Sequence, residues 1–188
     1  MADSLSGLEV AELSSARRIA DIGAGAGFPG LVLAIALPRA QVDLIESVGR
    51  KTAVIDRLIQ ASELRNARSI TARVEDYARV PAALGGGREA YGAVTARAVG
   101  PLALLVEYAA PLLRPDGVLV AWKGARDSAE EAAGAAAAAM VGMAVKEVVP
   151  VQPYPASENR HLHVYRKIAP TPERFPRRVG IARKRPLA

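Results

Sequence analysis

A glycine-rich loop constrains the fold of this chain more than any other segment. Its sequence, Asp21-Ile-Gly-Ala-Gly-Ala-Gly-Phe-Pro-Gly30, follows a short apolar run over 18–22 and precedes an apolar segment over 30–37. The first run is typical of a buried strand, and Pro29 favours the first turn of a helix. Glycines permit positive φ angles and a close approach of the backbone to a ligand, and a helix N-terminus offers free N–H groups. The sequence therefore predicts a strand–loop–helix unit that binds a ligand.

Two classes of cofactor fit this loop. Gly25, Gly27 and Gly30 satisfy the Gly-x-Gly-x-x-Gly pattern of dinucleotide sites, which alone is a weak signal. The spacing Asp21-x-Gly23-x-Gly25-x-Gly27 also matches the methyltransferase pattern for S-adenosylmethionine. A carboxylate at the strand end would repel a pyrophosphate and attract the ammonium group of a methionine moiety. We therefore favour a methyltransferase over a nicotinamide-dependent oxidoreductase, and a loop that serves packing alone is the third interpretation.

Strand and helix patterns alternate along the rest of the chain. Such alternation predicts βαβ units and a parallel sheet, because parallel neighbours need a crossover connection. The last two strands leave no room for a helix between them, so we expect them to pair antiparallel at one edge. The expected strands are 18–22, 41–46, 67–71, 91–96, 118–123, 144–149 and 161–168, and the expected helices are 30–37, 50–61, 101–113 and 128–141.

Acidic and basic residues follow several of these strands. Glu46 ends the second strand and could accept two hydrogen bonds from a ribose diol, which both candidate cofactors possess. Glu75 or Asp76, after the third strand, could accept from an adenine amino group. Arg97 and Lys123 end the next two strands, and the carboxyl ends of parallel strands meet in one crevice. Two buried cations need an acid or an anionic ligand, and we favour an anionic substrate as their partner.

Charge and composition limit the class of protein further. The chain of 188 residues has a net charge of +6, and residues 166–188 hold eight of its basic residues and one acid. This concentration predicts a polyanionic partner bound through phosphate contacts. The chain has no cysteine and only two histidines, which argues against disulfides and a zinc site. No apolar run is long enough to span a membrane, so we expect a cytoplasmic protein that binds no metal and no membrane.

Motifs along almost the whole chain resemble one family, the bacterial glucose-inhibited division protein B group of 16S ribosomal RNA guanine-N7 methyltransferases. The Gly-Phe-Pro-Gly30 extension of the loop and the terminal Lys-x-Pro-Leu187 are far more specific than the glycine pattern. The resemblance is carried by Asp3-Ser-Leu5, the loop over 21–30, Glu46-Ser47 with Arg50-Lys51, Arg73-Val-Glu-Asp76, Thr95-Ala-Arg-Ala98, Trp122-Lys-Gly124, Arg174-Phe-Pro-Arg177 and Gly180-x-x-x-Lys184-x-Pro186-Leu187.

The resemblance implies a Rossmann-like class I methyltransferase with a mostly parallel seven-stranded sheet and an antiparallel edge strand. It implies transfer of a methyl group from S-adenosylmethionine to N7 of guanine 527, in the 530 loop of 16S rRNA, with Arg97 and Lys123 at the target base. The family's cofactor residues match Asp21, Gly23, Ala24, Gly25, Gly27, Phe28, Glu46, Val74, Glu75 and Arg97, and the residues expected to bind RNA are Arg174, Arg177, Arg178, Arg183, Lys184 and Arg185.

The organisation that follows is a methyltransferase domain over 1–168 and a basic C-terminal tail over 169–188. We expect a monomer whose partner is 16S rRNA or the small ribosomal subunit. Members of the family usually carry a helical segment before the Asp-Ser-Leu element, and this chain begins almost on that element. An RNA-binding module that retains the loop without turnover is therefore the alternative function.

Overall fold

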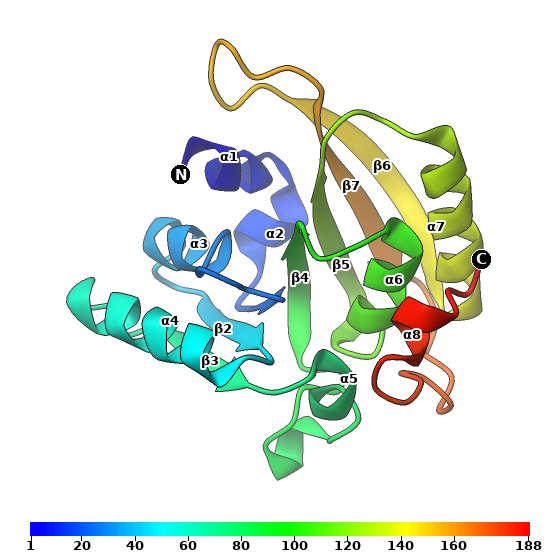
Figure 1. Ribbon diagram of the computed structural model, residues 1–188, viewed down its shortest axis with the longest axis horizontal. Coiled ribbons are helices and arrows are strands. Elements are labelled where there is room, and N and C mark those ends of the chain that lie inside the picture. Colours follow the sequence, from blue (N-terminus) through cyan, green and yellow to red (C-terminus); the bar gives the residue numbers. More distant parts are fainter.

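A computed structural model describes residues 1–188 and shows one α/β unit built on a seven-stranded sheet (Figure 1). The strand order is β3-β2-β1-β4-β5-β7-β6. The strands are β1 (Arg18–Ile22), β2 (Gln41–Glu46), β3 (Ala67–Thr71), β4 (Tyr91–Arg97), β5 (Leu113–Lys123), β6 (Met143–Val151) and β7 (Arg160–Lys167). The helices are α1 (Ala2–Leu5), α2 (Ala11–Ser15), α3 (Gly30–Ala36), α4 (Gly49–Ala61), α5 (Val74–Tyr77), α6 (Leu102–Ala109), α7 (Ser128–Met140) and α8 (Ile181–Lys184), with short 3₁₀ turns at Ser6–Glu9 and Ala82–Leu84.

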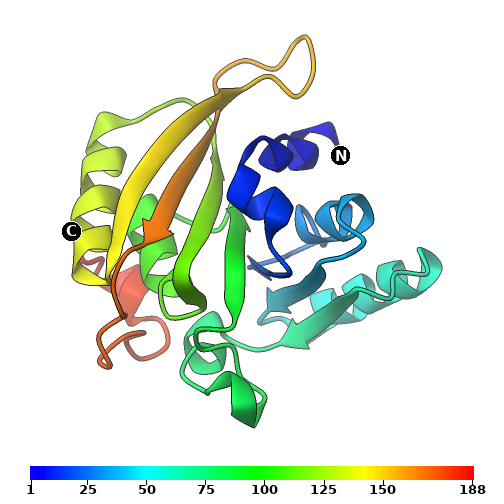
Figure 2. The ribbon, with the colours of Figure 1, turned by 180° about the vertical axis from the view of Figure 1, so that it is seen from behind.

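The pairing of the strands confirms the predicted architecture. Strands β1 to β5 pair in parallel, and β7 pairs antiparallel with both β5 and β6. The reversed strand is thus the second from the edge, and β6 closes that side. The loop between β6 and β7 projects beyond the body of the sheet (Figure 2). The chain order reverses between β1 and β4, and a reversal of this kind opens a crevice at the carboxyl ends of the two strands.

Alternation along the strands produces a hydrophobic core on each face of the sheet. Ile19 of β1 belongs to the core that α2, α3 and α4 cover, whereas Ala20 belongs to the core beneath α6 and α7. Figure 1 shows α3 and α4 on one side of the central strands and α6, α7 and α8 on the other. Both faces of the central strands β1 and β4 are therefore almost completely buried, whereas β3 at the edge of the sheet has no buried residue.

Strand β5 begins earlier than the sequence predicts. Its first residue, Leu113, pairs with Tyr91, and the register then shifts before Val118 pairs with Ala93. The intervening Arg-Pro-Asp-Gly segment has the composition of a turn, and Asp116 has a φ of 62°. This exposed bulge lies at the end of the sheet opposite to the crevice. Beyond it, β5 continues over 118–123, the range that the sequence predicts.

Residues 169–188 pack against the domain, although they contain only the short helix α8. Phe175 is 2% exposed and belongs to the core beneath α6 and α7. Its carbonyl oxygen accepts a hydrogen bond from Arg88, and that of Pro176 accepts one from Arg79. These contacts hold the segment so that α8 lies beside α6 (Figure 1).

Candidate functional site

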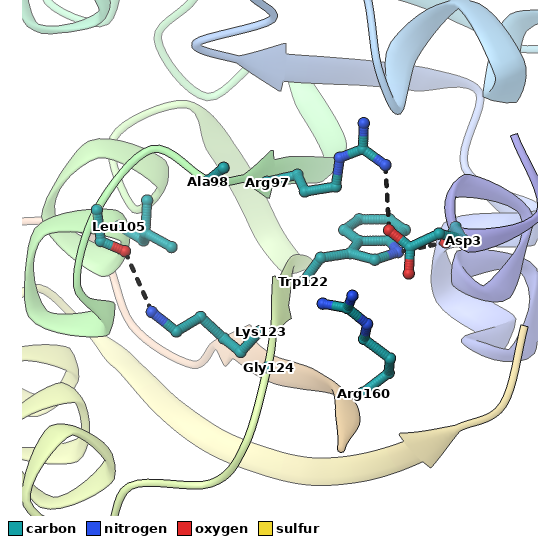
Figure 3. A pocket seen from close by; sticks show the side chains of 9 residues that line it. Asp3, Arg97, Ala98, Leu105, Trp122, Lys123, Gly124 and Arg160 are labelled. Atoms are coloured by element: carbon teal, nitrogen blue, oxygen red, sulfur yellow. Dashed lines mark hydrogen bonds and ion pairs between the residues drawn. The ribbon is translucent and has the colours of Figure 1, made fainter. Parts of the chain in front are cut away.

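Two adjoining cavities lie at the carboxyl ends of the parallel strands, and both include Ala98 in their walls. The first, which we call the loop cavity, has a volume of about 320 Å³ and is bounded by Gly23, Glu46, Glu75 and Tyr108. The second, which we call the edge cavity, has a volume of about 400 Å³; its nine lining residues are Asp3, Arg97, Ala98, Gly100, Leu105, Trp122, Lys123, Gly124 and Arg160 (Figure 3). Both volumes fall in the usual range of small-molecule sites.

The glycine loop adopts the backbone conformation that the sequence predicts. Gly23, Gly25 and Gly27 have φ angles of 65°, 58° and 94°, which residues with a Cβ rarely adopt. At Gly30 the restriction is one of space, because a Cβ atom there would lie 2.8 Å from Oδ2 of Asp21. The loop is therefore fixed in a shape that only these glycines allow, and it leaves Gly23 at the wall of the loop cavity.

Asp21 anchors this loop from inside the protein. It is fully buried, accepts hydrogen bonds from the Gly30 N–H at 2.9 Å and from Thr95 Oγ1 at 2.8 Å, and lines neither cavity. Attraction of a ligand's ammonium group by this carboxylate stays a prediction, and the side chain supports the loop from behind the cavity wall. Burial raises the pKa of Asp21 to about 7, because desolvation disfavours the charged form.

The buried carboxyl group leads to a prediction about pH. The pKa of an unfolded aspartate is near 4. Between about pH 4 and pH 7 the folded state therefore keeps a proton on Asp21 that the unfolded state has already lost. The folded state is therefore destabilised as the pH rises through this window. An Asp21→Asn variant imitates the protonated acid and should escape this loss. From pH 5 to pH 8 its stability relative to the parent should rise by about 2–3 kcal/mol, because the slope of about 1.4 kcal/mol per pH unit applies only up to the folded pKa of about 7.

Urea unfolding of both proteins at the two pH values measures this change. Asp56→Asn, at an exposed position on α4, is the matched control and should show no such change. A stability difference between Asp21→Asn and the parent that is equal at pH 5 and pH 8 would mean that the two hydrogen bonds keep Asp21 ionised despite its burial.

Glu46 joins the glycine loop to the end of β2. One carboxylate oxygen accepts from the Gly25 N–H at 3.1 Å and the other from the Val48 N–H at 3.0 Å. Its side chain is 7% exposed, and the residue lines the loop cavity, where Lys51 lies 3.9 Å from it. The carboxylate is thus held in a fixed orientation with capacity to accept further hydrogen bonds, such as those of a ribose diol.

The far end of the loop cavity is built by α5, α6 and the C-terminal segment. Val74 and Glu75 line the cavity, whereas Asp76 is exposed and lies outside it. Glu75 is 3% exposed, and the same carboxylate oxygen accepts from the Tyr108 hydroxyl at 3.1 Å and from the Gly180 N–H at 2.9 Å. Of the two acids that the sequence left open as acceptors for an adenine amino group, only Glu75 therefore lines the cavity.

Sequence reasoning did not identify Gly180 and Tyr108 as residues of this cavity, although both line it. Nor did it place Arg183 there; its guanidinium approaches the Val99 carbonyl oxygen at 3.4 Å. The terminal basic motif was interpreted only as a site for a polyanion. A contact between residues 75 and 180 leaves no signal in a single sequence.

Arg97 lies where the glycine loop approaches the edge cavity. Its guanidinium contacts Asp3 at 3.1 Å and lies 5.8 Å from the centre of the Phe28 ring. Phe28 is half-buried and lines neither cavity. Ala24 is buried, and its N–H donates to the Ile45 carbonyl oxygen. Arg97 is thus brought beside the loop, as predicted, while Ala24 and Phe28 support the loop from behind.

Acidic residues pair with both cations that end β4 and β5. Lys123 donates to Glu130 at 2.6 Å, and Arg97 to Asp3. Acids of the protein thus offset both cations, the alternative that the sequence left open, and an anionic substrate as a further partner stays a prediction. Arg160, which sequence reasoning missed, also lines the edge cavity (Figure 3). It is exposed, and its guanidinium forms no ion pair with an acid of the protein. Trp122 is buried in the core, as predicted, and still contributes to the cavity wall.

The basic residues of the C-terminal segment differ in their surroundings. Arg177 is half-buried, and its guanidinium donates two hydrogen bonds, at 2.8 and 2.6 Å, to the buried Glu107. That guanidinium stabilises the attachment of the segment to α6, and a contact of Arg177 with RNA stays a prediction. The other residues that the sequence assigned to RNA are all exposed: Arg174, Arg178, Arg183, Lys184 and Arg185.

Comparison with known proteins gives one consistent result. The family described as GidB, rRNA small subunit methyltransferase G, matches residues 1–162. Ribosomal RNA small subunit methyltransferase G of Roseiflexus castenholzii is 46% identical over 170 residues, which are 90% of this chain and 70% of that protein. The protein of the same name from Rubrobacter xylanophilus is 41% identical over 188 residues and is matched over 70% of its length.

Solved structures with low sequence identity share the fold. A predicted O-methyltransferase from Agrobacterium tumefaciens superposes with a TM-score of 0.66 at 24% identity, over 89% of this chain and 81% of that one. An S-adenosylmethionine-dependent O-methyltransferase from Thermotoga maritima gives 0.64 at 13% identity, over 90% and 66%. The structure has no helix with the length and apolar character needed to cross a membrane, and no cluster of side chains suited to holding a metal ion.

Proposed function

The chain belongs to the GidB family of rRNA small subunit methyltransferases G, and on that basis we propose that it methylates N7 of a guanine in 16S rRNA, guanine 527 of the 530 loop. As a member of this family it is an S-adenosylmethionine-dependent methyltransferase. We further propose that the protein is a monomer in the cytoplasm and that it acts on the small ribosomal subunit or its rRNA.

One observation carries the proposal: two cavities adjoin at Ala98, and one of them presents two buried carboxylates while the other is lined mainly by cations. The loop cavity offers the carboxylates of Glu46 and Glu75. These groups suit the hydroxyl and amino donors of an adenosyl group, and Gly23 leaves space for the group beside them. Bound there, the cofactor supplies an electrophilic methyl group on a sulfonium. The residues present therefore fit the cofactor that family membership requires.

The edge cavity suits an electron-rich base within a polyanionic chain. Arg97, Lys123 and Arg160 line it, and Asp3 is the one carboxylate in its wall; Glu130, which pairs with Lys123, lies outside the wall. Their positive field favours entry of RNA. The guanidinium of Arg97 and the ammonium group of Lys123 are held by ion pairs of 3.1 and 2.6 Å. Their charges are therefore in place before the substrate arrives, which is the condition for electrostatic preorganisation.

The residues at the site are consistent with methylation of a ring nitrogen. N7 of guanine carries a lone pair and loses no proton before it attacks, so no general base is required. Methylation of a pyrimidine carbon usually needs a cysteine, which this chain lacks. Enzymes that methylate exocyclic amines typically carry Asn/Asp-Pro-Pro-Tyr/Phe after the fourth strand, where this chain has Thr95-Ala-Arg-Ala98. Catalysis then depends on orientation of N7 toward the methyl group, with the cations positioned to contact O6 or a flanking phosphate.

The test is methyl transfer from labelled S-adenosylmethionine to small subunits from cells that lack the corresponding methyltransferase. We expect one methyl group per subunit, found by mass mapping as N7-methylguanosine in the 530 loop. Subunits that already carry the modification are the control and should accept no label. Salt-sensitive binding of subunits without transfer would instead support the alternative of an RNA-binding module.

A further inference from the structure

Asp3 differs in charge from the other polar side chains of the edge cavity. The cavity wall contains three cations and one carboxylate, which belongs to Asp3 of α1. A carboxylate in a site for a polyanion opposes binding unless the ligand offers it hydrogen-bond donors. Its presence in the wall therefore indicates which chemical groups of the substrate reach this side of the cavity.

The position of Asp3 is fixed by contacts from three residues. Its carbonyl oxygen accepts hydrogen bonds from Trp122 Nε1 at 2.8 Å and from Ser6 Oγ at 2.8 Å. Oδ2 of its side chain accepts from Arg97 at 3.1 Å, and Oδ1 accepts from no residue of the protein. The side chain is 26% exposed, and Figure 3 shows its second oxygen directed toward the space between Trp122 and Arg160. The carboxylate is therefore oriented and retains free acceptor capacity.

Among the four RNA bases, guanine alone presents two adjacent donors, N1–H and the N2 amino group, on its Watson–Crick edge. Adenine and cytosine place an acceptor beside their amino group, and uracil has a single donor between two carbonyl groups. A carboxylate can accept both guanine donors at once. N7 lies on the opposite side of the purine, so this contact leaves it free to be methylated.

We propose that Asp3 is the residue that selects guanine in the edge cavity, by accepting hydrogen bonds from N1–H and the N2 amino group. The inference rests on the proposed methylation of an rRNA guanine and adds the residue that recognises the base. A base without these donors would leave Oδ1 of Asp3 desolvated and without a hydrogen-bond partner, which is the strongest means by which a site rejects a close analogue.

A role limited to orienting Arg97 is the rival explanation, and inosine separates the two. Inosine keeps N7, O6 and N1–H but lacks the N2 amino group. Small subunits can be reconstituted with 16S rRNA that carries either guanosine or inosine at the target position, and kcat/KM measured for each. With the parent protein we expect inosine to be methylated about 10-fold less efficiently, because one hydrogen bond to a charged group is lost.

The Asp3→Asn variant keeps the main-chain contacts with Trp122 and Ser6. We expect its kcat/KM on guanosine to fall about 10- to 100-fold and its preference for guanosine over inosine to drop to about twofold or less. Binding of S-adenosylhomocysteine, measured by calorimetry, verifies that the variant is folded. Asp56→Asn is the matched control and should behave as the parent does.

Two results would overturn the inference. One is a parent protein that methylates guanosine and inosine equally well. The other is an Asp3→Asn variant that loses activity on both substrates by the same factor and keeps the preference, because Asp3 then acts only through Arg97. Absence of transfer by the parent to guanosine-containing subunits would instead refute the proposed function and this inference with it.

Discussion

Replacing Arg97 by alanine is expected to lower the rate of methyl transfer to small subunits by about 100-fold, the usual effect of removing one preorganised charge from an active site. Arg97 ends β4 at the boundary of the two cavities, and its guanidinium is fixed between Asp3 and the Phe28 ring. Alanine removes this charge and leaves the Asp3 carboxylate without its cation. Single-turnover transfer measured with saturating S-adenosylmethionine isolates this effect from binding.

The affinity for S-adenosylhomocysteine should change less, by about 10-fold at most, the equivalent of one lost electrostatic contact. Arg97 is absent from the wall of the loop cavity. Arg114→Ala, in the exposed bulge at the opposite end of the sheet, is the matched control. Transfer by the Arg97→Ala protein at the parental rate would show that this guanidinium has no part in the reaction.

The Glu46→Ala substitution should produce the largest loss of cofactor affinity, about 100-fold or more in the Kd of S-adenosylhomocysteine. The carboxylate holds the Gly25 and Val48 N–H groups and faces the loop cavity. Alanine therefore removes the proposed acceptor for the ribose and releases the loop from β2. Each hydrogen bond to a charged group contributes about 1.5–3 kcal/mol, so two of them account for an effect of this size.

Calorimetry provides the measurement, and two further variants make it specific. Glu46→Gln retains one acceptor oxygen and should lose only about 10-fold, the equivalent of one such bond. Glu63→Ala, at an exposed position just beyond α4, should bind as the parent does. If Glu46→Ala binds S-adenosylhomocysteine with parental affinity, the adenosyl group does not occupy the loop cavity.

The sequence was informative about the fold because hydrophobic runs, glycines and prolines act locally. The strands β1, β2 and β3 have the predicted ends, since each is a short segment bounded by polar or turn-forming residues. Strand β5 shows the limit of this reasoning: Pro115 and Gly117 indicate a turn, but the backbone there continues along β4 after a bulge.

The candidate site was predictable where a residue's role follows from its place at a strand end. Glu46, Arg97 and Lys123 all lie at the crevice because carboxyl ends of parallel strands share one edge. The direction of the Asp21 side chain was not predictable in this way. It depends on the partner opposite in the sheet, and the register of β1 with β4 places Thr95 there.

Contacts between distant segments account for the remaining differences. Asp3 pairs with Arg97, and Gly180 with Glu75, across 94 and 105 positions of the chain. Nothing in the local sequence around Asp3 shows that its carboxylate would offset a cation of β4. The ion pair of Arg177 with Glu107 belongs to the same class, and it explains why a terminal basic motif contains a residue that stabilises the fold.

The adjacency of the two cavities is the central claim, and a bisubstrate ligand tests it most directly. Such a compound joins 5′-deoxyadenosine through a short alkyl linker to N7 of guanosine, so that each half occupies its own cavity. Calorimetry should show binding at least about 10-fold tighter than that of S-adenosylhomocysteine, because linkage makes the second contact intramolecular. The gain should disappear in Arg97→Ala. A compound that binds the parent no more tightly than S-adenosylhomocysteine would contradict the account.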